Sequence, residues 1–99
     1  MQNQIEPQLE TKEAEDLYRA LASIDWSKNI AKFLRDILTI DEMEEMIRRF
    51  WVAKLLEEGK TVRTIVKETG VSSATISRIN YWLHHGMGGY SLALEKLKV

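Results

Sequence analysis

The sequence contains no cysteine, a single proline and no long apolar run. Without cysteine the chain has no disulfide, no thiolate zinc site and no cysteine nucleophile. No stretch approaches the ~18 consecutive apolar residues of a transmembrane helix, and the N-terminus lacks the basic and apolar regions of a signal peptide. We therefore expect a cytoplasmic protein without a membrane partner.

The chain also lacks an excess of charge of one sign, but its charges are unevenly spread. The 99 residues carry a formal net charge of −1, which excludes a basic tail that binds polyanions along the whole length. Residues 1–25 have a net charge of −4, whereas residues 59–86 have a net charge of +3. A phosphate backbone would therefore meet the second segment and avoid the first. The charged residues of the second segment are Lys60, Arg63, Lys67, Glu68 and Arg78.

Apolar side chains recur at helical spacing along nearly the whole chain, and no segment alternates with the period of a strand. This spacing predicts an all-α fold with six helices in one domain over residues 1–99. The expected parts are a frayed lead-in over 1–10, three helices over 11–58, a helix-turn-helix over 61–83 and a C-terminal helix over 90–98.

Capping residues mark where the first helices begin. We expect Thr11 to cap the first helix and Asp25 to cap the second. Thr39 and Glu42 have the spacing of a capping box, in which each side chain bonds the other residue's backbone amide. This box predicts that a third helix starts near residue 40 and runs to about residue 58.

The third helix is apolar on more than one face, and Gly59 is expected to end it in a left-handed conformation. A helix with this pattern needs more apolar partners than a chain of ~100 residues supplies, which favours burial against a second chain. Its apolar residues are Met43, Met46, Ile47, Phe50, Trp51, Val52, Leu55 and Leu56.

Residues 62–83 fit a helix-turn-helix, which needs a short helix, a tight turn and a second helix that crosses the first. Thr61 and Ser72 are expected to cap the two helices, and Gly70 lies where the turn requires a positive φ. The second helix begins with small hydroxyl residues and continues to Arg78, a combination suited to the major groove. Two packed helices without DNA-binding activity would give the same spacing, so both interpretations remain open at this point.

Several stretches resemble the Trp repressor family. Residues 64–78 (TIVKETGVSSATISR) are similar to the DNA-reading region of that family, and residues 38–42 (LTIDE) to the entry of its long central helix. Residues 52–61 (VAKLLEEGKT) and residues 88–90 (GGY) resemble its YerC/YecD branch more closely. The resemblance covers about residues 12–95.

The resemblance implies an intertwined homodimer, in which the first three helices of both chains form one core and the helix-turn-helix units project as heads. It also implies a transcriptional regulator, a repressor, that binds specific sequences of double-stranded DNA. Together with the local charge, it gives a set of expected DNA contacts. They are Lys60, Lys67, Ser72, Ser73, Ala74, Thr75, Ser77, Arg78 and Tyr81.

The same resemblance implies a pocket for a small-molecule effector. Arg49 and Arg78 match the arginines that flank the corepressor's ring in the family, and Thr39 matches a threonine that lines the pocket. Ile79 and Trp82 stand where the Trp repressor has small residues, so they would fill the space of a free tryptophan. We therefore expect that L-tryptophan is not a cofactor of this chain, and that any effector is a different small molecule.

Other chemistry has less support in the sequence. His84 and His85 are adjacent on a helix and point about 100° apart, so they cannot chelate a metal as an i, i+4 pair would. We therefore expect no metal site. No Ser-His-Asp or Cys-His set supports an enzyme. The competing function is a helical homodimeric interaction module that uses its basic head for a protein partner.

Overall fold

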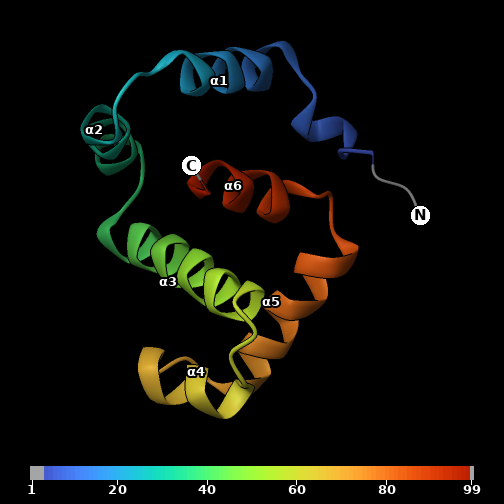
Figure 1. Ribbon diagram of the computed structural model, residues 1–99. Helices are drawn as coiled ribbons and strands as arrows, with labels where there is room; N and C mark the ends of the chain where they lie inside the picture. The colour runs from blue at the N-terminus through green and yellow to red at the C-terminus, as the bar shows by residue number, and fades with distance from the viewer. Residues whose placement is uncertain (1–3, 99) are drawn as a thin grey trace. The chain divides into compact units, whose positions relative to one another are not determined.

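The computed structural model describes residues 4–98, and helices account for most of that span (Figure 1). A short 3-10 helix, Pro7–Leu9, precedes six α-helices, and the described part of the chain contains no strand. The all-α prediction with six helices is confirmed. The helices are α1 (Lys12–Ser23), α2 (Ser27–Ile37), α3 (Ile40–Glu57), α4 (Val62–Thr69), α5 (Ser73–His85) and α6 (Gly89–Leu97).

The segment before α1 is more regular than the expected frayed lead-in. Pro7 begins the 3-10 helix, where proline is tolerated because the first residues of a helix have no intrahelical partner for their amide hydrogens. The Tyr18 hydroxyl of α1 donates a hydrogen bond of 2.8 Å to the Leu9 carbonyl oxygen. Residues 1–3 of the expected lead-in lie outside the described residues.

The start of α1 agrees with the sequence prediction, and the start of α2 does not. The Ala14 amide donates to Thr11 Oγ1 at 3.1 Å, as expected for an N-cap. Asp25, however, does not cap α2. Trp26 takes the N-cap position with φ of 75° and no capping bond from its side chain. Asp25 uses its backbone carbonyl instead, which accepts from the Asn29 side-chain amide at 3.0 Å.

Helix α3 carries the predicted signals at both ends. The Glu42 amide donates to Thr39 Oγ1 at 3.1 Å, and the Thr39 amide donates to Glu42 Oε1 at 2.9 Å, which completes the capping box. At the other end Gly59 has φ of 86°. The Lys60 amide donates to the Leu55 carbonyl at 3.1 Å, as in a Schellman motif. These bonds set the length of α3 at 18 residues.

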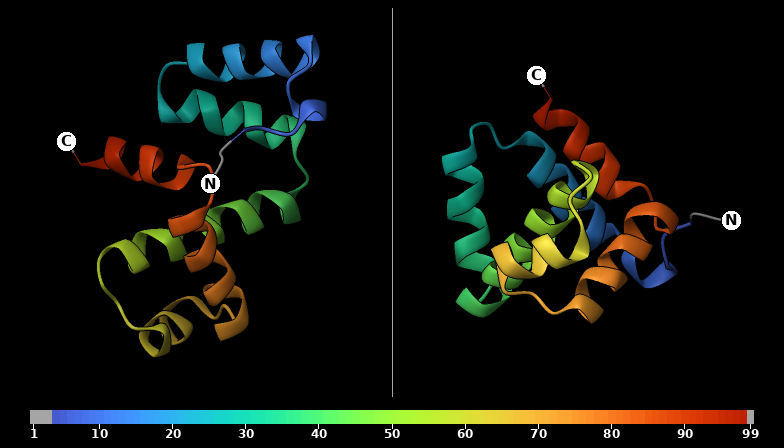
Figure 2. Two further views of the ribbon diagram at one scale, coloured as in Figure 1. Left: turned by 90° about the vertical axis from the view of Figure 1, so that its right-hand side faces the viewer. Right: turned by 60° about the horizontal axis from the view of Figure 1, so that its bottom comes forward.

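The described chain divides into two compact units, one over Gln4–Met43 and the other from Glu44 onward. In the first unit a short connection leads from α1 to α2 (Figure 2), and none of its described residues is buried. The second unit contains every buried residue of the described chain. One core therefore joins the C-terminal part of α3 to α4, α5 and α6. Its members are Val52, Ala53, Leu55, Ile65, Ile76, Ile79 and Leu94.

The other faces of α3 stay exposed, as its wide apolar band predicts. Met46, Ile47 and Trp51 are all exposed in the single chain, Ile47 by 58%. Exposed apolar surface of this kind is typical of regions that another chain covers. Large exposed apolar side chains on other helices include Leu17, Ile37, Leu92 and Leu97. Within the described residues, no helix combines the length and the apolar character needed to cross a membrane.

A left-handed glycine ends α4 and sets the turn to α5. Gly70 has φ of 75° and ψ of 3°, and its amide donates to the Val66 carbonyl at 2.9 Å. The Thr69 hydroxyl donates to the Ile65 carbonyl at 2.8 Å and accepts from the Val71 amide at 3.1 Å. The turn is therefore held by hydrogen bonds on both sides of the glycine.

We predict that Gly70→Ala lowers the free energy of unfolding by about 1–2 kcal/mol, because a residue with a Cβ is strained in the left-handed region. The new Cβ would meet no atom within 4 Å, so the loss reports backbone conformation alone. Gly89→Ala is the matched control, since Gly89 has equally open surroundings and no positive φ. Urea unfolding at one fixed protein concentration measures both variants. A Gly70→Ala protein as stable as wild type would contradict this account of the turn.

Candidate nucleic-acid interface

Helices α4 and α5 form the predicted pair of a short helix, a tight turn and a longer second helix (Figure 1). Thr61 caps α4, because its hydroxyl accepts from the Thr64 amide at 3.1 Å. Ile65 of α4 and Ile76 of α5 are fully withdrawn from solvent and share one core with Val52 of α3. This burial fixes which face of α5 turns inward.

The remaining face of α5 is exposed along its length. A helix advances 100° per residue, so positions 73, 77 and 81 follow one another along one stripe, with 74 and 78 beside it. The side chains on this stripe are small and polar near the start of the helix and larger further along. All five belong to the predicted DNA contacts: Ser73, Ala74, Ser77, Arg78 and Tyr81.

The start of α5 is organised by two hydroxyl residues from the same predicted set. The Thr75 amide donates to Ser72 Oγ at 3.2 Å, which is the predicted N-cap bond. The Ser72 hydroxyl in turn donates to Thr75 Oγ1 at 3.1 Å. The Thr75 hydroxyl is thereby oriented at the first turn of the helix, where the free amide groups favour a nearby anion.

Two lysines of the predicted set lie at the edges of this head, and both are exposed. Lys60 follows the end of α3, and Lys67 lies in the last turn of α4. A hydrogen bond of 2.7 Å from the Lys54 ammonium, and then its positive charge, lower the pKa of Glu58 below its ordinary value. An ionised Glu58 offsets part of the charge of Lys60, so Lys67 is the clearer test of phosphate attraction.

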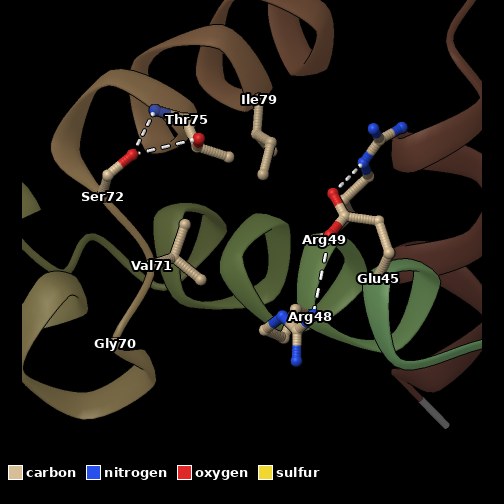
Figure 3. A pocket seen from close by; sticks show the side chains of 8 residues that line it. All are labelled: Glu45, Arg48, Arg49, Gly70, Val71, Ser72, Thr75 and Ile79. Atoms are coloured by element: carbon tan, nitrogen blue, oxygen red, sulfur yellow. Dashed lines mark hydrogen bonds and ion pairs between the residues drawn. The ribbon is translucent and has the colours of Figure 1, made fainter. Parts of the chain in front are cut away.

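A cavity of about 200 Å³ lies between α3 and the start of α5 (Figure 3). It opens beside the hydroxyl pair, so it adjoins the N-terminal turn of the second helix. Two of the predicted effector-pocket residues, Arg49 and Ile79, line it. The full lining is Glu45, Arg48, Arg49, Gly70, Val71, Ser72, Thr75 and Ile79.

The other three predicted pocket residues do not line this cavity. Thr39 belongs to the first unit, where its hydroxyl holds the capping box. Arg78 lies on the exposed stripe of α5. Trp82 is 56% exposed and lies edge-on to Tyr81, with ring centroids 5.1 Å apart. Ile79 and Trp82 were expected to fill the space of a free tryptophan. Only Ile79 lines this cavity, and it is 5% exposed.

The predicted site residues include neither Glu45 nor Arg48, the two other charged residues of the cavity, nor its Gly70 and Val71. The Arg49 Nε atom donates to Glu45 Oε2 at 2.9 Å, and Arg48 Nη2 lies 3.7 Å from Glu45 Oε1 (Figure 3). An acid three and four residues before two arginines is the usual spacing of helical ion pairs, so the pairing was visible in the sequence. Their position beside α5 was not, because it depends on how α3 packs on α5.

A second hollow lies further along α5 and shares Ser77 and Tyr81 with the exposed stripe. Its lining is Ser77, Asn80, Tyr81, His84 and His85. The rings of Tyr81 and His85 lie 4.8 Å apart at a tilt of 37°. The His84 Nδ1 atom lies 3.2 Å from the Asn80 carbonyl oxygen. Both histidines are therefore engaged with residues of their own helix, one turn before them.

Comparison with known proteins identifies the family of this fold. The family model described as Trp repressor protein matches residues 12–98. The chain belongs to the Trp repressor family. Among curated proteins of this family, it is 37% identical over 90 residues to YerC of Bacillus subtilis (strain 168), an uncharacterized protein. The match covers 91% of this chain and 86% of YerC.

Solved structures of Trp-repressor-like proteins share the fold. A TrpR-like protein from Eubacterium eligens ATCC 27750 matches with a TM-score of 0.86 and 38% identity, over 93% of this chain and 95% of that one. A candidate Trp repressor from Staphylococcus aureus matches with a TM-score of 0.85 and 29% identity, over 93% and 92% of the two chains. The resemblance to the Trp repressor family and its YerC branch is therefore confirmed. This family consists of DNA-binding regulators.

Proposed function

We propose that the chain is a sequence-specific DNA-binding transcriptional regulator, a repressor, that reads the major groove with α5. The observation that carries this proposal is the exposed stripe of α5 opposite its buried isoleucines. Ser73, Ala74 and Ser77 are short enough to let the helix approach base edges, and Arg78 supplies a bidentate donor. Thr75 holds a phosphate beside the first turn of the helix.

Loss of DNA affinity in single variants tests this assignment. Arg78→Ala and Thr75→Ala should weaken binding to a selected duplex, by about 1–3 kcal/mol where a bidentate base contact is lost. Lys67→Ala should lower affinity for all sequences and reduce the slope of log K against log salt by about one. Lys96→Ala on α6 is the control that removes an equal charge outside the head. Fluorescence anisotropy with labelled DNA measures all four, and equal affinity of wild type and Arg78→Ala would rule out α5 as the reading helix.

The competing function is a helical interaction module whose basic head binds a protein. A gel shift on random duplex DNA at low salt distinguishes the two functions. A DNA-binding protein retards such DNA weakly and in a salt-sensitive way even without its operator, because phosphate contacts carry no sequence information. The local net charge of +3 and the family of DNA-binding regulators favour the DNA interpretation.

We propose further that the functional form is a homodimer. Met46, Ile47 and Trp51 of the apolar band of α3 are exposed in the single chain, and the first unit has no buried residue of its own among those described. A second copy would cover these faces and present two heads about one helical turn of DNA apart, ~34 Å. The DNA site would then be a pseudo-palindrome.

Sedimentation equilibrium at micromolar concentration is expected to give twice the chain mass of 11.5 kDa. Ile47→Glu places a charge on the exposed apolar band and should shift the equilibrium toward monomer. Arg63→Glu, at an exposed position of α4 outside the apolar band, is the control and should leave the dimer intact. A wild-type protein that sediments as a monomer with its helicity intact would disprove the dimer.

We propose that L-tryptophan is not an effector of this chain. The cavity beside α5 has about 200 Å³, less than the ~300–1,000 Å³ usual for pockets that enclose a drug-sized ligand. Ile79 lines it and is almost completely buried in the core. A bulky ring would have to displace this side chain, whose burial contributes roughly 1.5–3 kcal/mol.

Calorimetric titration with L-tryptophan should therefore show no micromolar binding to wild type, and DNA binding should not require the amino acid. Ile79→Ala should open the cavity, so any binding gained should appear in this variant. Trp82→Ala is the matched control, because Trp82 does not line the cavity, and it should behave as wild type. A clear micromolar signal with the wild-type protein would refute the filled pocket.

A further inference from the structure

An acidic side chain lies inside the cavity whose other charged residues are arginines. Glu45, Arg48 and Arg49 lie within two turns of α3, and both arginines direct donors at the Glu45 carboxylate (Figure 3). Glu45 is half-buried, whereas both arginines are exposed. Its side chain is nevertheless 47% exposed, so the carboxylate lies at the edge of the cavity between the two arginines.

The rest of the cavity offers groups that suit an oxyanion. Two guanidinium groups carry positive charge and the planar donor geometry that fits carboxylate or phosphate oxygens. The hydroxyl groups of Ser72 and Thr75 line the same space from the first turn of the proposed reading helix. An oxyanion that entered here would need the donors that Glu45 already uses.

We propose that Glu45 is a built-in competitor that an incoming phosphate oxyanion must displace from Arg48 and Arg49. If the phosphate belongs to DNA, the inference rests on the proposed function, because the DNA backbone would then pass beside the first turn of α5. Glu45 then weakens DNA binding by keeping two nearby cations occupied in the free protein. A free phosphate ion has the same chemistry and would meet the same competitor.

The size of the effect follows from the exposure of the pair. Ion pairs at exposed positions contribute about 0.2–1 kcal/mol, which corresponds to at most about a fivefold change in affinity. Glu45→Gln keeps the length of the side chain and removes its charge. We therefore expect Glu45→Gln to tighten DNA binding by about two- to fivefold at low salt, with a smaller gain at high salt.

Two matched controls separate this role from a general change in charge. Glu44→Gln removes the same charge from the neighbouring position, which is exposed and in no ion pair among the described residues. If Glu45 acts through the arginines, its substitution should have no effect in an Arg48→Ala, Arg49→Ala background. DNA affinity is measured by anisotropy for wild type and each variant, and circular dichroism checks that all are equally helical.

A second arm uses inorganic phosphate without DNA, followed by NMR shifts of the arginine Nε–H groups. The proposal is supported if Glu45→Gln binds DNA or phosphate more tightly than Glu44→Gln and this gain is lost in the double-arginine background. The arm that shows the gain tells whether Glu45 competes with DNA phosphate or with free phosphate. Equal effects of the two glutamate substitutions in both arms, or a gain that persists without the arginines, would overturn it. Wild-type protein that binds no DNA would refute the proposed function, while the phosphate arm would still decide the role of Glu45.

Discussion

Burial of Ile65 and Ile76 in one core with α3 is the interaction on which the head depends. Each side chain contributes roughly 1.5–3 kcal/mol through removal of its apolar surface from water. The greater consequence is geometric, because burial of Ile76 sets the rotation of α5 about its own axis. Positions 74 and 78, two before and two after it, then point away from the core. The left-handed turn at Gly70 sets the direction in which α5 leaves α4, and the buried isoleucines set which residues of α5 face the core.

The two compact units differ in how they keep their shape. The unit that begins at Glu44 has a core of seven buried side chains drawn from four helices. The unit over Gln4–Met43 has two amphipathic helices, yet no described side chain in it is buried. Its local order comes from capping bonds and from the Tyr18 contact to Leu9. Bonds of that kind fix backbone direction but do not remove apolar surface from water, and Leu17 and Ile37 of this unit stay exposed in the single chain.

Sequence analysis succeeded where a feature depends on residues within a few positions of one another. The capping box of Thr39 and Glu42 specifies where α3 begins. Gly59 and Gly70 specify where α3 and α4 end. In each case the bonds involved span about one helical turn. The prediction that Asp25 caps α2 was wrong, because Trp26 takes the N-cap position with a positive φ and the helix starts one residue later. The carbonyl of Asp25 accepts a bond from the Asn29 side chain instead. The place of Glu45 beside α5 could not be predicted, because it depends on packing between segments nearly 30 residues apart. Trp82 does not line this cavity, because the residue three positions past the buried Ile79 is already exposed on α5.

The three tryptophans lie on different elements, and each has a different neighbourhood. Trp26 precedes α2 and is 79% exposed, Trp51 lies on the apolar band of α3, and Trp82 stands edge-on to Tyr81 on α5. Indole emission moves to shorter wavelength when water is removed from the ring. The chain thus carries its own optical probes: Trp51 for contacts on α3, Trp82 for contacts along α5, and Trp26 for the start of α2. Single-tryptophan versions of the protein would separate these three signals without any added label.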